Sequence, residues 1–180
     1  MYRKEVNERS PLRVFERSVH GGLGPGNLGV VLARAGVGKT AFLAQIALAD
    51  LLHERKVLHL RPSSSVAEVR QCYDARFADL LQHTPLEDPG AAGLLIERNR
   101  MVQVYLGHSL SSERLARVMD MLRDHADFVP ALILVDGVDW TLFDPVELEE
   151  FKDIALAAQA ELWMTAVTTR HARSGDSEVL

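Results

Sequence analysis

The sequence predicts an α/β protein with a mainly parallel, five-stranded sheet flanked by helices. Five short apolar runs alternate with longer segments of helical pattern, as in folds built from strand-helix-strand units. The run 131–135 is apolar at every position, which is typical of a central parallel strand. A single domain over 1–180 is expected, because 180 residues, 47% of them hydrophobic, can bury one core.

The predicted elements follow a lead-in over 1–20. The five predicted strands are Leu28–Ala33, Val57–Leu60, Met101–Leu106, Ala131–Val135 and Leu162–Thr168. A helix from about Lys39 to His53 is apolar nearly all round, so we expect it to be buried. Ser65 and Glu68 have the spacing of a capping box, which starts a helix that reaches about Gln82.

The remaining helices also begin at recognisable caps. Ser111 or Ser112 caps a helix to about His125, and Asp144 followed by Pro145 opens one to about Ala160. The segment 83–100 is predicted to be a surface loop, with a short helical turn after 94, because 83–93 holds two prolines and two glycines. The polar residues 171–180 are predicted to form a flexible tail.

Composition narrows the classes of partner. The net charge of -5 gives no global basic surface, so DNA binding by this domain is not expected. The single cysteine, Cys72, excludes an internal disulfide and fits a reducing compartment as a buried or half-buried residue. The sequence has no signal-peptide pattern and no apolar stretch of membrane-spanning length. We therefore expect a cytoplasmic protein without a membrane partner.

Residues 33–40, Ala-Arg-Ala-Gly-Val-Gly-Lys-Thr, match the Walker A spacing of a P-loop with alanine in the first position. The glycines let the backbone curl so that several N–H groups face one phosphate, at the positive end of the following helix. The Lys39 ammonium reaches the outer phosphates, and the Thr40 hydroxyl ligates Mg²⁺. The residues expected to bind ATP or ADP are Ala35, Gly36, Val37, Gly38, Lys39, Thr40 and Ala41.

Asp136 directly follows the run 131–135 and is interpreted as the Walker B carboxylate. The carboxyl ends of parallel strands form the edge where open α/β sheets bind ligands, so Asp136 can hold Mg²⁺ opposite Thr40. Lys39 and Asp136 are therefore the candidate catalytic residues, and Thr40 and Asp136 the candidate magnesium ligands. Asp139 is a less favoured second carboxylate. The alternative for Asp136 is a solvated cap at the end of its strand.

Residues 21–32, Gly-Gly-Leu-Gly-Pro-Gly-Asn-Leu-Gly-Val-Val-Leu, resemble the segment before the P-loop in the RecA/KaiC/DnaB group of ATPases. The resemblance implies a RecA-like core over about 20–170, with the strand 162–168 between the P-loop strand and the Asp136 strand. It also implies a nucleotide sensor at Thr168, Thr169 or Arg170. A homo-oligomer or a RecA-like partner protein would be expected on the same ground.

The chain departs from that group in two places. Where the group has a glutamate that orients the attacking water, this chain has Arg61 to Ser65, and the nearest carboxylate, Glu68, is already explained as part of a cap. The extra strands and the DNA-contacting loop that follow the core in the recombinases are expected to be largely absent, because only about a dozen residues follow the last predicted strand. These departures favour a weak ATPase or a nucleotide-dependent regulatory or assembly protein.

Two other functions remain open from the sequence. One is a P-loop kinase of a small metabolite, and the other is a non-hydrolysing structural interaction module. Arg98 and Arg100 either serve as an arginine finger for a neighbouring subunit or lie on a solvated face. Trp140 and Phe143 are interpreted as core residues. The seven histidines show no paired metal-ligand spacing, so no metal site beyond Mg²⁺ is predicted.

Overall fold

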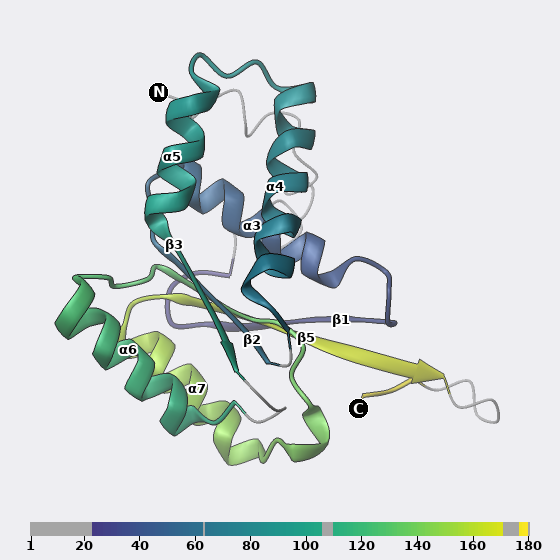
Figure 1. Cartoon of the computed structure of the whole chain (residues 1–180). Helices are drawn as coiled ribbons and strands as arrows, with labels where there is room; N and C mark the ends of the chain where they lie inside the picture. The colour runs from purple at the N-terminus through teal and green to yellow at the C-terminus, as the bar shows by residue number, and fades with distance from the viewer. Residues whose placement is uncertain (1–22, 63, 106–109, 171–176, 180) are drawn as a thin grey trace.

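The computed structural model describes residues 23–62, 64–105, 110–170 and 177–179, and it has five parallel strands between two layers of helices (Figure 1). The strands are β1 (Leu28–Ala33), β2 (Val57–Pro62), β3 (Arg100–Tyr105), β4 (Leu132–Val135) and β5 (Glu161–Arg170). The helices are α3 (Lys39–Leu52), α4 (Val66–His83), α5 (Pro89–Asn99), α6 (Ser112–Ala126) and α7 (Pro145–Ala157), with a 3-10 helix, η1 (Trp140–Leu142). The predicted fold class is therefore confirmed.

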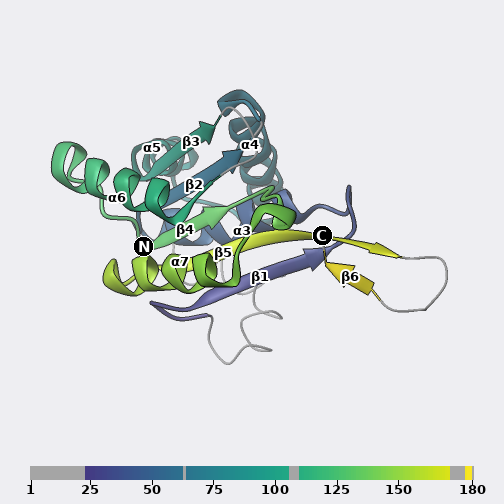
Figure 2. The ribbon, with the colours of Figure 1, turned by 90° about the horizontal axis from the view of Figure 1, so that it is seen from below.

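The order of the strands in the sheet is β1-β5-β4-β2-β3, and all four pairings are parallel. The predicted position of the last long strand, between the first strand and the strand that ends at Asp136, is confirmed. Figure 2 shows the five strands side by side with their arrowheads in the same direction. The segments that follow β1, β2 and β4 consequently leave the sheet at one common edge.

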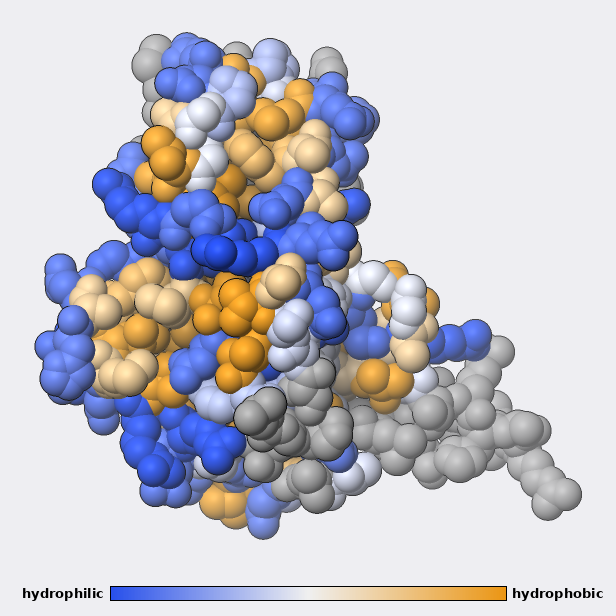
Figure 3. Space-filling model, viewed as in Figure 1, coloured by the Kyte–Doolittle hydropathy of each residue, from blue (hydrophilic) through white to orange (hydrophobic). Residues whose placement is uncertain are grey.

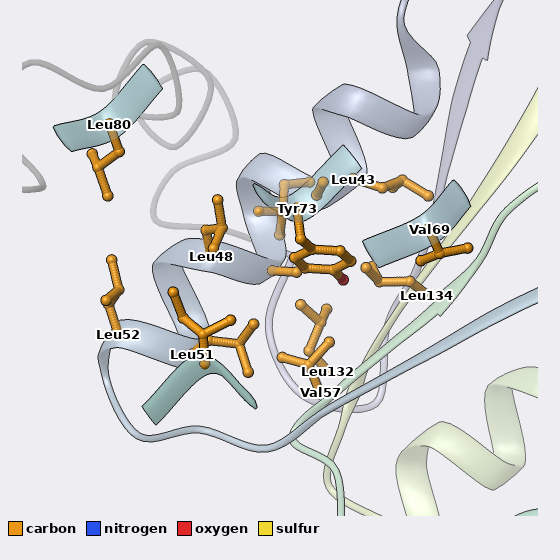
Figure 4. Close-up of a cluster of buried hydrophobic side chains, with 14 of the residues drawn as sticks. Leu43, Leu48, Leu51, Leu52, Val57, Val69, Tyr73, Leu80, Leu132 and Leu134 are labelled. Carbon is orange, nitrogen blue, oxygen red and sulfur yellow. The ribbon is translucent and has the colours of Figure 1, made fainter. Parts of the chain in front are cut away.

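Each face of the sheet has its own hydrophobic core. Helices α3, α4 and α5 cover one face, and α6 and α7 cover the other (Figure 1). Figure 3 shows the outer surface in the same view, where hydrophilic and hydrophobic residues are interspersed. Side chains of β4 alternate between them, with Leu132 and Leu134 in the first core and Ile133 and Val135 in the second. Figure 4 shows the first core, where Tyr73 lies among leucines of α3 and β4. Helix α3 is buried along most of its length, as predicted.

Three helices begin at the caps that the sequence predicts. The Ser65 side chain accepts a hydrogen bond from the Glu68 backbone N–H at the start of α4. Ser111, rather than Ser112, does the same at α6, and Asp144 caps α7 immediately before a proline. These contacts satisfy backbone donors that the first turn of a helix leaves without intrahelical partners.

The prediction of a surface loop over 83–100 is wrong for most of that segment, because residues 89–99 form helix α5. The Asp88 side chain accepts a hydrogen bond of 2.9 Å from the Ala91 N–H, and Pro89 occupies the first turn, where its missing N–H costs nothing. Ala92 and Ile96, four residues apart, are buried in the first core. The proline and glycine that predicted a loop therefore lie in the first turn of a packed helix.

The predicted flexible tail is also wrong in part. Residues 177–179 form a short strand, β6 (Ser177–Val179), that pairs antiparallel with the far end of β5. The rest of that segment, 171–176 and 180, and the predicted lead-in over 1–20 lie outside the described residues. Among the described helices, none is both long enough and apolar enough to cross a membrane.

The segment before β1 makes a close turn against the second helical layer. Gly26 has φ of +78°, and a Cβ added there would lie 2.6 Å from Leu156 Cδ1 of α7. Its backbone N–H donates to the Ala160 carbonyl at 2.7 Å, just before β5. Only glycine fits both the left-handed backbone and the close approach. The glycine-rich approach to the loop therefore has a packing role, which fixes the start of β1 against β5.

Candidate functional site

A glycine-rich segment, residues 33–40, runs from the last residue of β1 through a loop into the first turn of α3, at the common edge of the sheet. We call it the glycine loop. Gly36 and Gly38 have φ of +75° and +96°, and a Cβ added at either would meet nothing within 4 Å. Glycine is favoured there by the left-handed backbone, which other residues rarely adopt, and not by lack of space. The sequence pattern therefore folds as expected of a curled loop that leads into a helix.

The glycine loop presents unpaired backbone donors to solvent. Residues 34–38 are exposed, and within the described part of the chain no acceptor contacts the backbone N–H groups of Gly36, Val37 or Gly38. The loop also lies at the N-terminus of α3, where the helix dipole is positive and first-turn N–H groups have no intrahelical partner. Such an arrangement is suited to an anion, and to phosphate in particular.

Lys39 bends back across the glycine loop. Its Nζ donates hydrogen bonds to the carbonyl oxygens of Ala33 at 3.1 Å and Arg34 at 2.9 Å. The ammonium is therefore held at the loop, with neutral backbone oxygens as its partners. An anionic oxygen would be a stronger partner for it, because the attraction between opposite charges would add to the hydrogen bond.

Thr40 and Asp136, 96 residues apart in the sequence, meet at the sheet edge, where Thr40 Oγ1 donates to Asp136 Oδ2 at 2.7 Å. The residue Asp136 is only 3% exposed. Its other oxygen, Oδ1, accepts a hydrogen bond of 2.9 Å from Thr165 Oγ1 on β5. The solvated cap considered as an alternative is wrong, because this carboxylate is buried and bonded on both oxygens.

Thr165 and Arg61 complete this cluster, and neither residue was predicted from the sequence to belong to it. Thr165 also accepts a hydrogen bond from the Gly137 N–H at 2.8 Å, which fixes the backbone just after Asp136. Arg61, at the end of β2, places Nη1 3.1 Å from Asp136 Oδ2 and 3.2 Å from Thr40 Oγ1. A threonine inside the apolar run 162–168 was the available signal for Thr165.

The donor set can be tested against Mg²⁺, the metal that the sequence pattern implies. Mg²⁺ prefers oxygen ligands, and the Thr40 hydroxyl and Asp136 carboxylate oxygens lie 2.7 Å apart. Two oxygens at that separation fit neighbouring positions around one small ion. The Arg61 guanidinium, however, already contacts both of these oxygens. The oxygen ligands therefore fit the metal, and a cationic side chain competes with it.

Neither of the other candidate carboxylates joins the cluster. Glu68 accepts a hydrogen bond of 2.6 Å from Ser64 Oγ, and this bond is the main cause that lowers the pKa of Glu68. Asp139 caps η1, where its Oδ1 accepts from the Thr141 backbone and hydroxyl. Ser63, in the stretch 61–65 that replaces the glutamate of the RecA/KaiC/DnaB group, lies outside the described residues. Both carboxylates thus have local structural roles.

Arg98 and Arg100 lie at the opposite edge of the sheet, where β3 begins. Arg98 is exposed. Arg100 is buried, bonded to Glu97 and stacked 4.6 Å from the centre of the Tyr73 ring. For Arg100, both the arginine finger and the solvated face are wrong, since its guanidinium packs inside its own chain.

The remaining predicted residues lie as follows. Trp140 and Phe143 pack against the second core, as predicted, and Trp140 Nε1 donates to the Thr165 carbonyl at 2.8 Å. Cys72 is half-buried on α4, also as predicted. Thr168 lies on β5 just past Val167, the partner of Ala33, while the side chains of residues 169 and 170 are not described.

No known protein-family model matches the chain. No curated protein matches it significantly either. The structure defines the chain as an α/β protein with a five-stranded parallel sheet.

Proposed function

We propose that the glycine loop binds the phosphates of a nucleoside di- or triphosphate such as ATP or ADP. The single observation that carries the proposal is the exposed loop with two left-handed glycines and unpaired N–H groups at the start of α3. Backbone donors aimed outward at a helix N-terminus bind phosphate without any side chain. The contacting backbone would run from Ala35 to Ala41.

Three side chains around the glycine loop have roles in this proposal. Lys39 exchanges its two loop carbonyls for the outer phosphates, and Thr40 and Asp136 carry the oxygens that would hold Mg²⁺. When bound, that ion would neutralise charge on the phosphates. Thr165 keeps Asp136 oriented through its hydrogen bond to Oδ1. The strand order, with β5 between β1 and β4, supports a protein of the RecA/KaiC type.

Within this proposal, hydrolysis by the chain alone is slow or absent. A water that attacks phosphorus needs a group that holds it in line and accepts its proton. At the end of β2 this chain has Arg61, which cannot accept a proton, and Glu68 and Asp139 are engaged in local hydrogen bonds. A nucleotide-dependent regulatory or assembly role fits such a site better than rapid turnover.

A small-molecule kinase would need an acceptor pocket beside Asp136. The structure has a pocket of about 260 Å³ between α6 and α7, but Val129, Pro130, Ala157 and Ala158 of its lining precede β4 and β5. That places the pocket at the edge of the sheet opposite the glycine loop. A pocket in this position cannot hold an acceptor beside Asp136, so the structure favours a nucleotide-binding module that does not hydrolyse over a kinase.

Isothermal titration calorimetry of ATP and ADP with Mg²⁺ tests the proposal on the full chain. We expect the parent protein to bind and to melt at a higher temperature with nucleotide. Lys39→Ala should weaken binding by about tenfold or more, because a hydrogen bond between charged groups contributes about 1.5–3 kcal/mol. Lys152→Ala, which removes an exposed lysine of α7, is the matched control and should bind as the parent does.

Either of two results would contradict the proposal. One is the absence of heat of binding at millimolar nucleotide. The other is a Lys39→Ala protein that binds as tightly as the parent, since the ammonium would then make no contact with the phosphates.

A further inference from the structure

A positively charged side chain of the protein contacts the hydrogen-bonded pair of Thr40 and Asp136. Arg61 Nη1 lies 3.1 Å from Asp136 Oδ2 and 3.2 Å from Thr40 Oγ1, so one nitrogen contacts both oxygens. The Asp136 side chain is 4% exposed and that of Arg61 28% exposed. The pair therefore combines a buried carboxylate with a cation that remains partly open to solvent.

The backbone holds Arg61 beside Asp136. Strands β2 and β4 are neighbours, with Leu60 in register with Val135, so the next residues of the two strands are Arg61 and Asp136. The Asp136 N–H donates to the Leu60 carbonyl at 2.9 Å, which extends the ladder to the carboxylate itself. The contact thus belongs to the sheet and does not depend on a loop.

The charge of this cluster is already balanced. A guanidinium stays protonated at all physiological pH values, and it neutralises the Asp136 carboxylate through a direct contact. For Mg²⁺ to bind the same two oxygens, Arg61 would have to leave, and the carboxylate would lose its present partner. A guanidinium also has a planar set of donors that suits phosphate oxygens.

We infer that Arg61 takes the place of Mg²⁺ at this site, so that the nucleotide binds to the glycine loop without a divalent cation. The inference rests on the proposed function and revises its metal requirement. Arg61 is a specificity-determining residue in this scheme, because its guanidinium supplies the positive charge that Mg²⁺ would otherwise supply, so that nucleotide binding does not depend on the metal.

Calorimetry of ATP binding to the full chain, once with Mg²⁺ and once with excess EDTA, tests the inference. For the parent protein we expect dissociation constants within about threefold of each other. In Arg61→Gln, binding in EDTA should weaken by about tenfold or more, because a charge-assisted contact to phosphate is lost, and Mg²⁺ should restore much of it. Arg70→Gln, which removes an exposed arginine of α4, should behave as the parent.

The outcomes separate the two proposals. Parent binding that needs Mg²⁺ overturns the inference and leaves the proposed function standing, and this comparison requires no variant to fold. Metal-independent binding that Arg61→Gln leaves unchanged in EDTA overturns the role of Arg61. The absence of ATP binding in both buffers overturns the proposed function and, with it, the inference.

Discussion

Acid should destabilise this protein through His59, a buried histidine on β2. Its side chain is in the sheet interior, 0% exposed, with Nδ1 3.0 Å from the Tyr73 hydroxyl oxygen. Its Nε2 has no hydrogen-bond partner among the described residues. Burial is the largest cause that lowers the pKa of His59 from 6.5 to about 4. Arg61 and Arg100 lower it further, while Asp136 acts in the opposite direction.

The direction of the pH effect depends on whether the folded or the unfolded state binds the proton more readily. The unfolded chain protonates His59 near pH 6.5, whereas the folded protein does so only near pH 4. Between these values the unfolded state binds more protons, so the free energy of unfolding falls as the pH falls. Each unit of difference in pKa corresponds to about 1.4 kcal/mol. Between pH 6.5 and about pH 4, His59 therefore lowers the free energy of unfolding by about 3 kcal/mol, and above pH 6.5 this loss is absent.

Urea unfolding of the parent and of His59→Gln, measured from about pH 7 to about pH 4, checks this reasoning. The variant keeps a hydrogen-bonding side chain but cannot titrate, so its free energy of unfolding should fall by about 3 kcal/mol less than that of the parent. His125→Gln, which replaces an exposed histidine of α6, should follow the parent. Parallel curves for the parent and His59→Gln would refute the assignment of the acid sensitivity to His59.

Two further predictions concern ATP hydrolysis and DNA binding. The full chain should release phosphate from ATP at well below about 1 per second at any protein concentration. A faster rate lost in Glu68→Gln or Asp139→Asn would show that one of these carboxylates acts as the base, and a rate that rises with self-association would indicate a site shared between subunits. Labelled single- and double-stranded DNA should not be retained by micromolar protein in roughly 150 mM salt, and retention there would contradict the expectation drawn from the acidic composition.

The strands were the most predictable elements because buried parallel strands are apolar at consecutive positions. The bounds predicted for β1 agree with the structure, and those for β4 differ by one residue. Helix α5 was missed because Pro89 and Gly90 were taken as breakers, although both lie in its first turn. The strand β6 was missed for a different reason. Its three residues are held by pairing with β5, and a local sequence pattern does not indicate such a contact.

The meeting of Thr40 with Asp136 was predictable for a similar reason. Both residues follow strands that run in the same direction, so both lie at one edge, and the motif at 33–40 supplied the spacing. The partners of the Asp136 carboxylate could not be predicted from the sequence. These partners, Thr165 and Arg61, come from two other strands, and their proximity depends on the strand order in the sheet.

The interpretation of Arg61 changes once the register of β2 and β4 is known. As part of a sequence it marked only the absence of a catalytic glutamate after the second strand. In the sheet it lies one residue past the Leu60–Val135 pair, directly beside Asp136, and its charge opposes that of the carboxylate. Under the proposed function, Arg61 would therefore act on the phosphates as a fixed cation, although it cannot activate water. Arg61 in place of a glutamate thus argues against hydrolysis and, at the same time, predicts binding without Mg²⁺. Nucleotide binding in EDTA therefore tests this site more directly than turnover does.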